Sequence, residues 1–191
     1  MFQAVIVDYV RSPFVPARKG PFATLRPDDI AAEVVKALIS RTGIDPGMIE
    51  DLMLGCAFPE GEQGLNLARL VGLLAGLPQS VAGVTINRFC GSSMQAIHAA
   101  AGAIAMGAGE VFVCVGVESM SRVPMMGFNP LPNPKLNGAL PAAYIGMGET
   151  AENVARRYKI SRADQEAFAA QSHHKAARAN LAAEIVAVGG I

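Results

Sequence analysis

The sequence contains little charge for its length. Asp, Glu, Lys and Arg make up 17% of the 191 residues, whereas about 25% is usual in soluble domains. Sixteen basic residues balance sixteen acidic ones, so the basic surplus that typifies nucleic-acid binding is missing and we expect no nucleic-acid partner. Hydrophobic residues make up 51%, which excludes an intrinsically disordered chain. Two interpretations of the low charge stay open: part of the surface is covered by a partner or by further chain, or the domain is simply rich in alanine.

Cysteine is scarce as well. The odd number of cysteines and their wide, irregular spacing (Cys56, Cys90 and Cys114) exclude a disulfide framework and a zinc site, and we expect no metal. Free cysteines suit a reducing compartment, so a cytoplasmic location is expected. Cys56 and Cys114 fall within predicted strands, and we expect both to be structural.

Long hydrophobic runs are also missing. No apolar run reaches the roughly 20 residues that a helix needs to cross a membrane, so no membrane partner is expected. Residues 1–13 lack the basic start and long apolar core of a signal peptide. The longest charge-free stretch, residues 91–109, contains Gln, His and Ser, and it predicts a buried helix instead.

What the first part of the chain does contain is an alternation of strand-like and helix-like apolar patterns. The predicted strands are residues 2–10, 51–58, 81–89 and 110–117, and the predicted helices between them are residues 28–42, 66–77 and 92–106. This βαβαβαβ order predicts an α/β fold with a mixed, mostly parallel sheet and helices on both of its faces. The connections between parallel strands are expected to be right-handed.

The composition changes near residue 120. Residues 120–148 are rich in Pro, Gly and Asn and predict a long irregular segment, which is typical of a functional loop or an excursion between domains. Two helices are expected after it, one over about 150–158 and one that starts at Ser161, and a short strand is expected over 184–188. We therefore divide the chain into residues 1–119 and 120–191.

Cys90 lies where the third predicted strand meets the third predicted helix. A thiol at a helix N-terminus feels about half a positive charge and meets free backbone N–H groups, and both effects lower the pKa of a cysteine from about 8.5. Gly91, Ser92 and Ser93 have little bulk and leave room for a substrate. The N–H of Cys90 is itself a candidate oxyanion donor. Cys90 is therefore the candidate nucleophile, and the alternative is the commoner role of a free cysteine as a small buried hydrophobe.

A nucleophilic cysteine needs a base, and no histidine is well placed to be one. His98 lies eight residues beyond Cys90 on the same predicted helix, which is roughly 12 Å along the axis, and it is expected to be packed or partnered. His173 and His174 lie in a predicted helix beyond the Pro-rich segment and are expected to be solvated. Either Cys90 is not catalytic, or its base lies outside these residues.

Several stretches resemble the thiolases. The stretch NRFCGSSMQAIHAAAGAIAMGAGEVFVCVGVESMSRVPM resembles their acyl-enzyme signature. The stretches RSPFVPARKG and DDIAAEVV resemble their first loop and helix, and MGETAENVARRYKISRADQEAFAAQSHHKA with the later EIVAV resembles their loop domain. The resemblance covers essentially the whole chain in order. It implies a thiolase-like fold in which residues 1–119 are the N-terminal core half and residues 120–191 are a loop-domain segment.

The resemblance also implies an activity, acetyl-CoA acyltransferase. A thiolate attacks the 3-keto carbon of a 3-ketoacyl-CoA, acetyl-CoA leaves, and the acyl group then passes to free coenzyme A, which is a substrate rather than a bound cofactor. By similarity Cys90 carries the acyl group. Met147 matches the turn that contacts the pantetheine of CoA, although Gly146 stands where some relatives have a polar His. The alternative is a loop methionine that only fills a gap in the packing. The sequences of these motifs resemble the degradative enzymes of fatty acid β-oxidation more than the biosynthetic acetoacetyl-CoA thiolases, which are the alternative.

The chain departs from the thiolase pattern in its length. Thiolases are about twice as long, and their second half supplies an Asn-Glu-Ala-Phe segment, a Gly-His-Pro histidine and a second cysteine, none of which occurs here. The resemblance thus implies an incomplete half that lacks normal turnover alone and that works with a missing C-terminal half or partner chain in a homo-oligomer, a dimer or tetramer. The alternatives are a non-catalytic module that binds CoA thioesters and an interaction subunit.

Overall fold

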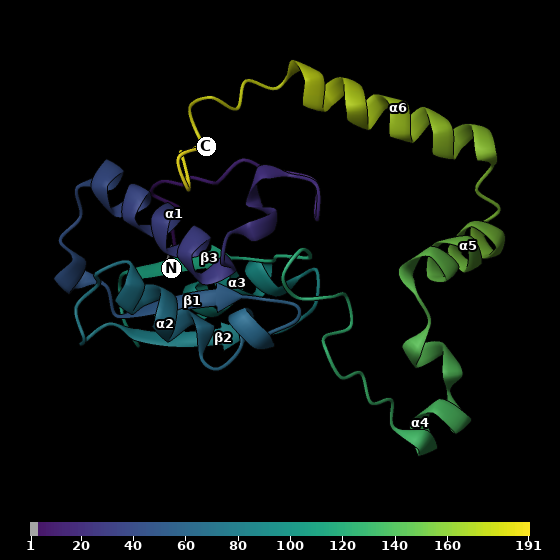
Figure 1. The fold of residues 1–191 in the computed structure, drawn as a ribbon, viewed down its shortest axis with the longest axis horizontal. Helices are drawn as coiled ribbons and strands as arrows, with labels where there is room; N and C mark the ends of the chain where they lie inside the picture. The colour runs from purple at the N-terminus through teal and green to yellow at the C-terminus, as the bar shows by residue number, and fades with distance from the viewer. Residues whose placement is uncertain (1–3) are drawn as a thin grey trace. The chain divides into compact units, whose positions relative to one another are not determined.

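The structure is a computed structural model that describes residues 4–191. It divides into two units, which are treated separately (Figure 1). The first unit runs up to Asn129 and also includes Glu184–Ile191, and the second unit is Pro130–Ala183.

A three-stranded parallel sheet forms the centre of the first unit. Because the strands are parallel and in register, their carboxyl ends meet at one edge, where Gly55 lies between Ile86 and Gly116. The strands, in sheet order, are β2 (Ala82–Ile86), β1 (Asp51–Gly55) and β3 (Phe112–Gly116).

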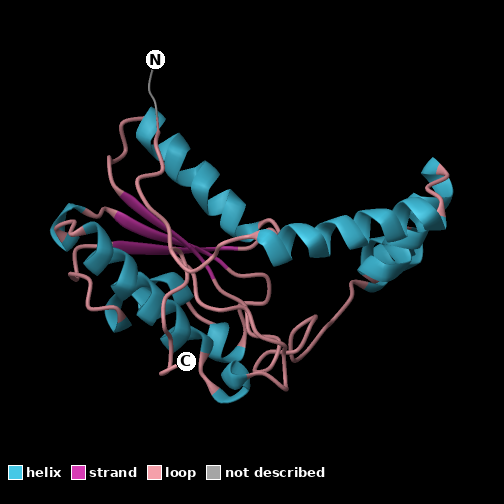
Figure 2. Cartoon of the chain, turned by 90° about the horizontal axis from the view of Figure 1, so that it is seen from above, coloured by secondary structure: helices cyan, strands magenta, loops and turns pink. Residues whose placement is uncertain are grey.

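Helices cover both faces of this sheet, as Figure 2 shows. They are α1 (Pro27–Thr42), α2 (Leu67–Leu74) and α3 (Ser92–Ala105). Alternate side chains of β1 point to opposite faces: Leu52 and Leu54 are buried against α1 and α2, while Met53 packs against Ala96 and Ala100 of α3. Each fully buried leucine contributes about 1.5–3 kcal/mol to stability. The predicted α/β fold with helices on both faces is confirmed.

Local signals at their ends explain where the helices begin and end. In α1, Asp28 and Asp29 occupy the first turn, where acidic side chains suit the helix dipole, and Gly43 ends the helix with a left-handed φ of 65°. Asn66 caps α2 through a hydrogen bond that its side chain accepts from the Arg69 N–H. These helices therefore lie close to their predicted positions.

Two predicted strands are not formed. Residues 4–10 have no strand pairing, and residues 2 and 3 lie outside the described part of the chain. Val5, Ile6 and Val7 are 73–85% exposed. The segment predicted as the last strand, 184–188, contributes only a single parallel bridge, between Ile185 and Arg11. Both predictions are wrong because β-branched sequence favours a strand only where a neighbouring strand supplies the hydrogen bonds.

The prediction of a buried helix over 91–109 is correct for one side of α3 only. Ala96 and Ala100 are buried on the sheet, whereas Met94 is 53% exposed and Ile97 is 43% exposed. We call the side of α3 that carries Met94 and Ile97 its outer face. This face also carries the exposed His98, has no Asp, Glu, Lys or Arg, and within residues 4–191 is left exposed by the rest of its own unit.

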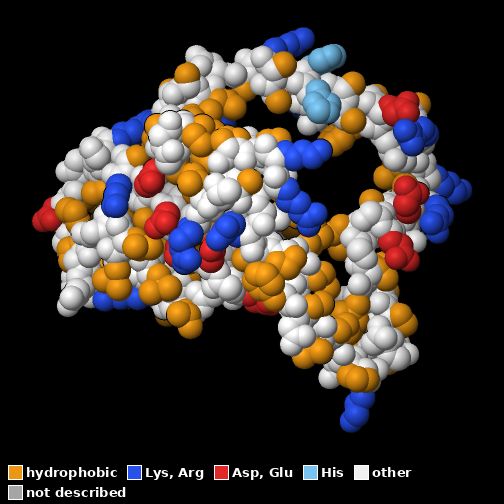
Figure 3. Space-filling view, in the orientation of Figure 1, with side chains coloured by type: hydrophobic (Ala, Val, Ile, Leu, Met, Phe, Trp, Pro, Cys, Tyr) orange, Lys and Arg blue, Asp and Glu red, His pale blue; other side chains and the backbone are white. Residues whose placement is uncertain are grey.

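The second unit consists of helices without a buried core. Its helices are α4 (Pro134–Ala139), α5 (Met147–Tyr158) and α6 (Arg162–Arg178), and none of their residues is buried. Figure 3 shows charged side chains and the histidines of α6 at the surface of this unit. Ser161 caps α6 as predicted, by accepting a hydrogen bond from the Asp164 N–H. The predicted irregular segment 120–148 is correct apart from α4, a short 3-10 helix, Pro141–Tyr144, and its last two residues, which already belong to α5.

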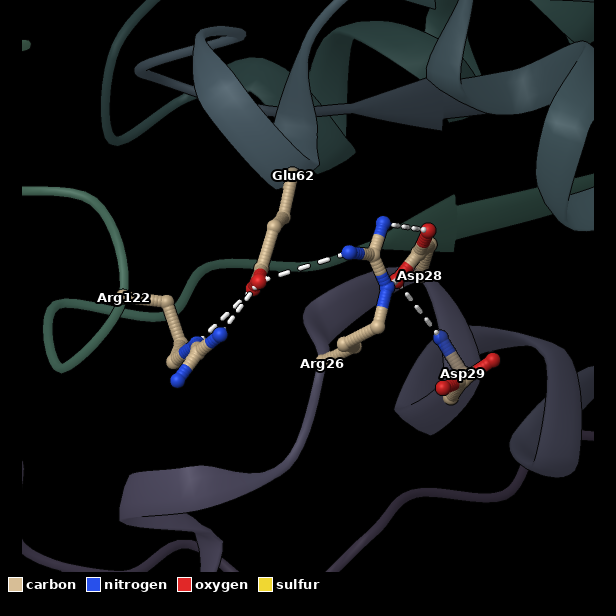
Figure 4. A network of polar contacts seen from close by, with 5 residues as sticks. All are labelled: Arg26, Asp28, Asp29, Glu62 and Arg122. Carbon is tan, nitrogen blue, oxygen red and sulfur yellow. Dashed lines mark hydrogen bonds and ion pairs between the residues drawn. The ribbon is translucent and has the colours of Figure 1, made fainter.

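A network of ion pairs fastens the segment after β3 to the rest of the first unit (Figure 4). Arg122 donates two hydrogen bonds to the carboxylate of Glu62, one of them of 2.8 Å from Nε. Arg26 lies 3.3 Å from the same carboxylate and donates two hydrogen bonds, of 2.7 and 3.0 Å, to Asp28 at the start of α1. The hydrogen bonds from Arg122, followed by the charges of both arginines, lower the pKa of Glu62.

Candidate active site

Cys90 lies in the turn that joins β2 to α3, at the carboxyl edge of the sheet, and its side chain is exposed. The structure therefore places it at the predicted junction of strand and helix, and the alternative of a small buried hydrophobe is wrong. We call residues 87–92 the Cys90 turn.

Two side chains at the ends of the Cys90 turn hold its backbone. Asn87 accepts a hydrogen bond of 2.9 Å from the Phe89 N–H. Ser92, which is buried, accepts a hydrogen bond of 2.8 Å from the Arg88 N–H and donates one of 2.5 Å to the Phe89 carbonyl. Phe89 has a φ of 45°, a left-handed conformation that costs a bulky residue roughly 1–3 kcal/mol. The bonds around Phe89 offset this cost and present Cys90 to solvent.

Two glycines form a floor beneath the start of α3. A Cβ atom on Gly55 would lie 2.3 Å from the backbone of Ser92 and Ser93, and one on Gly116 would lie 2.7 Å from the Cβ of Ser93. Gly55 and Gly116 are neighbours across the sheet. The first turn of α3 therefore rests directly on the strand ends, and this contact sets the height of the Cys90 turn above the sheet.

Polar side chains link the strand ends next to the Cys90 turn. Glu118, just beyond β3, accepts a 2.7 Å hydrogen bond from the Ala57 N–H and another of 2.7 Å from the fully buried Gln63. The amide of Asn87 donates a 3.0 Å hydrogen bond to the Ala57 carbonyl. The roles of Asn87, Gln63 and Glu118 were not predicted from the sequence. Two of them could have been found, because Asn87 and Glu118 are the first polar residues after two of the strands.

The other two cysteines are structural, as predicted. Cys56 is buried beside Gln63 and Glu118, and burial, followed by the charge of Glu118, raises the pKa of its thiol to about 12. Cys114 lies half-buried in β3, where burial, followed by the charge of Asp51, raises the pKa of its thiol. Both thiols are therefore protonated at neutral pH, and neither is a competing nucleophile.

The three histidines all lie at exposed positions. His98 is exposed on α3, so the prediction that it is packed is wrong. His173 and His174 are exposed on α6, as predicted. Within the described residues of the first unit, no hydrogen bond joins Cys90 to His98.

Met147 is the first residue of α5 and is 70% exposed. The residue before it, Gly146, occupies the N-cap position and has no side chain to accept a hydrogen bond there. Met147 belongs to the second unit and Cys90 to the first. The side chain of Met147 is thus free to contact a ligand.

A cavity of about 510 Å³ lies away from Cys90. It is enclosed by residues 10–17, by α1 and by the stretch 113–121, and its walls are mostly apolar. Neither Asn87 nor Cys90 lines it.

Within residues 4–191 no group of three His, Cys, Asp or Glu side chains is arranged to hold a metal ion. No helix of the described chain is both long and apolar enough to cross a membrane.

Comparison with known families decides the identity of the chain. The family described as Thiolase, N-terminal domain, matches residues 4–190. The chain belongs to the thiolase family. This confirms the predicted resemblance.

Named thiolases support the same assignment. The chain is 51% identical over 179 residues to a 3-ketoacyl-CoA thiolase of Bacillus subtilis (strain 168), which covers 94% of the chain and 46% of that protein. It is 44% identical over 195 residues to a 3-ketoacyl-CoA thiolase of Colwellia psychrerythraea, which covers 100% of the chain and 50% of that protein. The crystal structure of the Bacillus anthracis acetyl-CoA acetyltransferase matches with a TM-score of 0.78 and 34% identity, over 94% of this chain and 49% of that one. The chain thus spans about half the length of the curated relatives that it matches.

Proposed function

We propose that this chain is the acyl-carrying part of a 3-ketoacyl-CoA thiolase, with Cys90 as the nucleophile. The observation that carries the proposal is the exposed thiol of Cys90 in a strand-to-helix turn of a thiolase-family chain. Relatives named 3-ketoacyl-CoA thiolase favour the degradative reaction of fatty acid β-oxidation. A biosynthetic acetoacetyl-CoA thiolase is the second candidate, because the similar crystal structure is named an acetyl-CoA acetyltransferase.

The proposed reaction has two thioester steps. The thiolate of Cys90 forms a bond to C3 of a 3-ketoacyl-CoA, the bond between C2 and C3 breaks, and the enolate of acetyl-CoA leaves and takes up a proton. The thiolate of free CoA then attacks the acyl carbon, and the sulfur of Cys90 leaves. The N–H of Cys90 is proposed to stabilise an oxyanion. CoA is a substrate here, and no bound cofactor is required.

The rest of the machinery is proposed to come from a C-terminal half or a partner chain. Two observations support this: within the described residues of the first unit His98 forms no hydrogen bond with Cys90, and the outer face of α3 exposes Met94 and Ile97. In this proposal residues 1–119 are the core half, residues 120–191 are a loop-domain segment, and Met147 contacts the pantetheine of CoA. The complete enzyme is proposed to be a cytoplasmic dimer or tetramer, and the described chain alone is expected to lack normal turnover, since each missing proton transfer costs roughly 10²- to 10⁴-fold.

Acyl labelling tests the proposal. We expect acetyl-CoA to acetylate Cys90 in the folded chain, as detected by peptide mass spectrometry, and Cys90→Ser to abolish the label. Cys114→Ser is the matched control and should leave the label in place, because that thiol is half-buried with a raised pKa. An unlabelled Cys90, or equal labelling of Cys56, would contradict the assignment. Binding of CoA without any acetylation would favour a non-catalytic thioester-binding module or an interaction subunit.

A rate measurement tests the need for a second half. We expect thiolysis of a 3-ketoacyl-CoA by the 191-residue chain to fall far below the ordinary enzymatic range of about 1–10³ s⁻¹. Turnover within that range would show that these residues contain a complete active site.

A further inference from the structure

Asn87 binds the backbone in two directions at once. Its side-chain oxygen accepts the 2.9 Å hydrogen bond from the Phe89 N–H, which makes an Asx turn immediately before Cys90. Its side-chain nitrogen donates the 3.0 Å hydrogen bond to the Ala57 carbonyl, just beyond the end of β1. One side chain therefore shapes the backbone before the reactive cysteine and ties that backbone to the neighbouring strand.

The peptide to which Asn87 is tied is itself well anchored. The N–H of Ala57 donates to one oxygen of Glu118, and the other oxygen of that carboxylate accepts from Gln63. Gln63 is fully buried, and its own side-chain oxygen accepts a 2.6 Å hydrogen bond from the Ser119 N–H. A continuous series of hydrogen bonds thus leads from the interior to Asn87.

An aromatic contact joins the same two segments a second time. The ring of Phe89 lies 6.0 Å from that of Phe58, with the planes tilted by 50°. Such pairs contribute about 0.5–1.5 kcal/mol beyond the burial of their area. The left-handed φ of 45° at Phe89 is unfavourable for a bulky side chain, so it persists only where the surroundings hold it. Asn87 accepts the hydrogen bond from the N–H of Phe89, and Ser92 donates to its carbonyl.

We propose that Asn87 is a positioning residue for Cys90: it holds Phe89 in the left-handed conformation and so sets the direction in which the Cys90 thiol leaves the turn. This inference rests on the proposed function, because direction matters only if Cys90 must meet a thioester carbonyl. Acyl transfer is sensitive to such direction, and a misplacement of about 1 Å can cost as much as 10²-fold in rate. Asn87 is exposed, so its replacement removes the two hydrogen bonds of its side chain without opening a cavity in the core.

The experiment compares three variants of the chain with the wild type. Asn87→Ala removes both hydrogen bonds. Asn87→Ser keeps a shorter, uncharged acceptor for the Phe89 N–H and loses the bond to Ala57. Asn66→Ala is the matched control, because Asn66 also donates to a carbonyl, that of Gly83 at 2.7 Å, and also accepts from a backbone N–H, but its bonds reach β2 at Gly83 and Thr85 and not the Cys90 turn itself.

Two rates at Cys90 and the thermal midpoint are measured. In the first reaction the sulfur of Cys90 bonds to the acetyl carbon of acetyl-CoA, the thioester bond to CoA breaks, and CoA leaves as its thiol with the proton that Cys90 lost. The second reaction is alkylation by iodoacetamide, a small reagent that approaches an exposed thiol from many directions. Only the acetylation should depend strongly on the direction of the thiol.

We expect Asn87→Ala to slow acetylation about fivefold, in line with the loss of a hydrogen bond of about 1 kcal/mol, and to change alkylation less than about twofold. Asn87→Ser should recover part of the acetylation rate. Asn66→Ala should react at the wild-type rate even where its thermal midpoint is lower. Acetylation of Asn87→Ala at the wild-type rate would overturn the inference, and so would an equal slowing in Asn66→Ala. A wild-type chain that is never acetylated would instead overturn the proposed function.

Discussion

The three cysteines of this chain differ because of the backbone around them. Cys90 is exposed in a turn, Cys114 is half-buried in a strand, and Cys56 is buried against Gln63 and Glu118. Position in the sequence was enough to separate them, since a cysteine between two valines inside a strand pattern differs from one at the junction of a strand and a helix. The polar partners of Cys56 were not predictable, because Gln63 and Glu118 meet only once the strands are ordered.

Alkylation should therefore be selective at the residue scale. In the native chain at pH 7 we expect iodoacetamide to modify Cys90 at least about tenfold faster than Cys56, whose thiol is buried and has a pKa raised to about 12. In denaturant the difference should vanish. Peptide mass spectrometry over a time course measures both rates, and equal native rates at the two residues would contradict the described burial.

Glu62 should make stability depend on pH. The hydrogen bonds from Arg122 lower its pKa from the ordinary value of 4.5, so its stabilising effect is present above that value and is lost as the pH falls through the lower folded pKa. We expect Glu62→Gln to reduce the free energy of unfolding at pH 7 by less than about 1 kcal/mol, because the pair is partly solvated. The difference from the wild type should shrink towards pH 3. Urea unfolding at both pH values measures this.

Glu152→Gln serves as the control for that prediction. Glu152 is exposed on α5, and no ion pair is recorded for it within the described chain. Its variant should match the wild type at both pH values. A pH-independent loss in Glu62→Gln would mean that the side chain acts through packing instead of charge.

At the scale of elements, local signals predicted most of the first unit. Residues 28–42 carry acidic residues at one end and are followed by a glycine, and the sequences of β1 to β3 are apolar stretches bounded by turns. Residues 4–10 show where such reasoning fails, since their pattern favours a strand but a strand also needs a neighbour. The hydrogen bond from Asn87 to Ala57 forms because β2 lies next to β1 in the sheet. The order of strands in a sheet cannot be predicted from the sequence of any one strand.

The glycine floor beneath α3 makes a second element-scale prediction. Gly55→Ala should lower the free energy of unfolding by about 1–3 kcal/mol, because its Cβ would lie 2.3 Å from the backbone of Ser92 and Ser93, which cannot rotate away. The displaced start of α3 should also slow acetylation of Cys90. Gly102→Ala is the matched control: no atom lies within 4 Å of its added Cβ, so a helical alanine there should stabilise the chain by about 0.5–1 kcal/mol. Urea unfolding that ranks the two variants the other way would contradict the described contact.

At the scale of the whole molecule, the low charge and the outer face of α3 agree. Only 17% of the residues are charged, and one side of α3 exposes Met94 and Ile97 without a charged neighbour on that helix. The first of the two interpretations of the composition, a surface covered by other chain, therefore gains a specific location. The length comparison agrees, since the chain spans about half of its named relatives.

A charge on the outer face should change the behaviour of the chain in solution. We expect the wild-type chain to self-associate at micromolar concentration through its uncovered apolar surface, and Ile97→Lys to reduce this while leaving the thermal midpoint nearly unchanged, because Ile97 is already 43% exposed. Light scattering and thermal unfolding measure the two properties. Ala100→Lys, at a buried position of the same helix, should instead destabilise the fold. A fully monomeric wild-type chain would contradict the prediction.

The paired glycines beneath the reactive turn also provide a way to recognise related genes. Gly55 and Gly116 are far apart in the sequence but adjacent in space, and each is required because a side chain would collide with the helix above it. A sequence search can require both glycines at the ends of apolar stretches, with a cysteine turn between them. Such a search depends on the contact that supports α3 and not on the residues next to the cysteine.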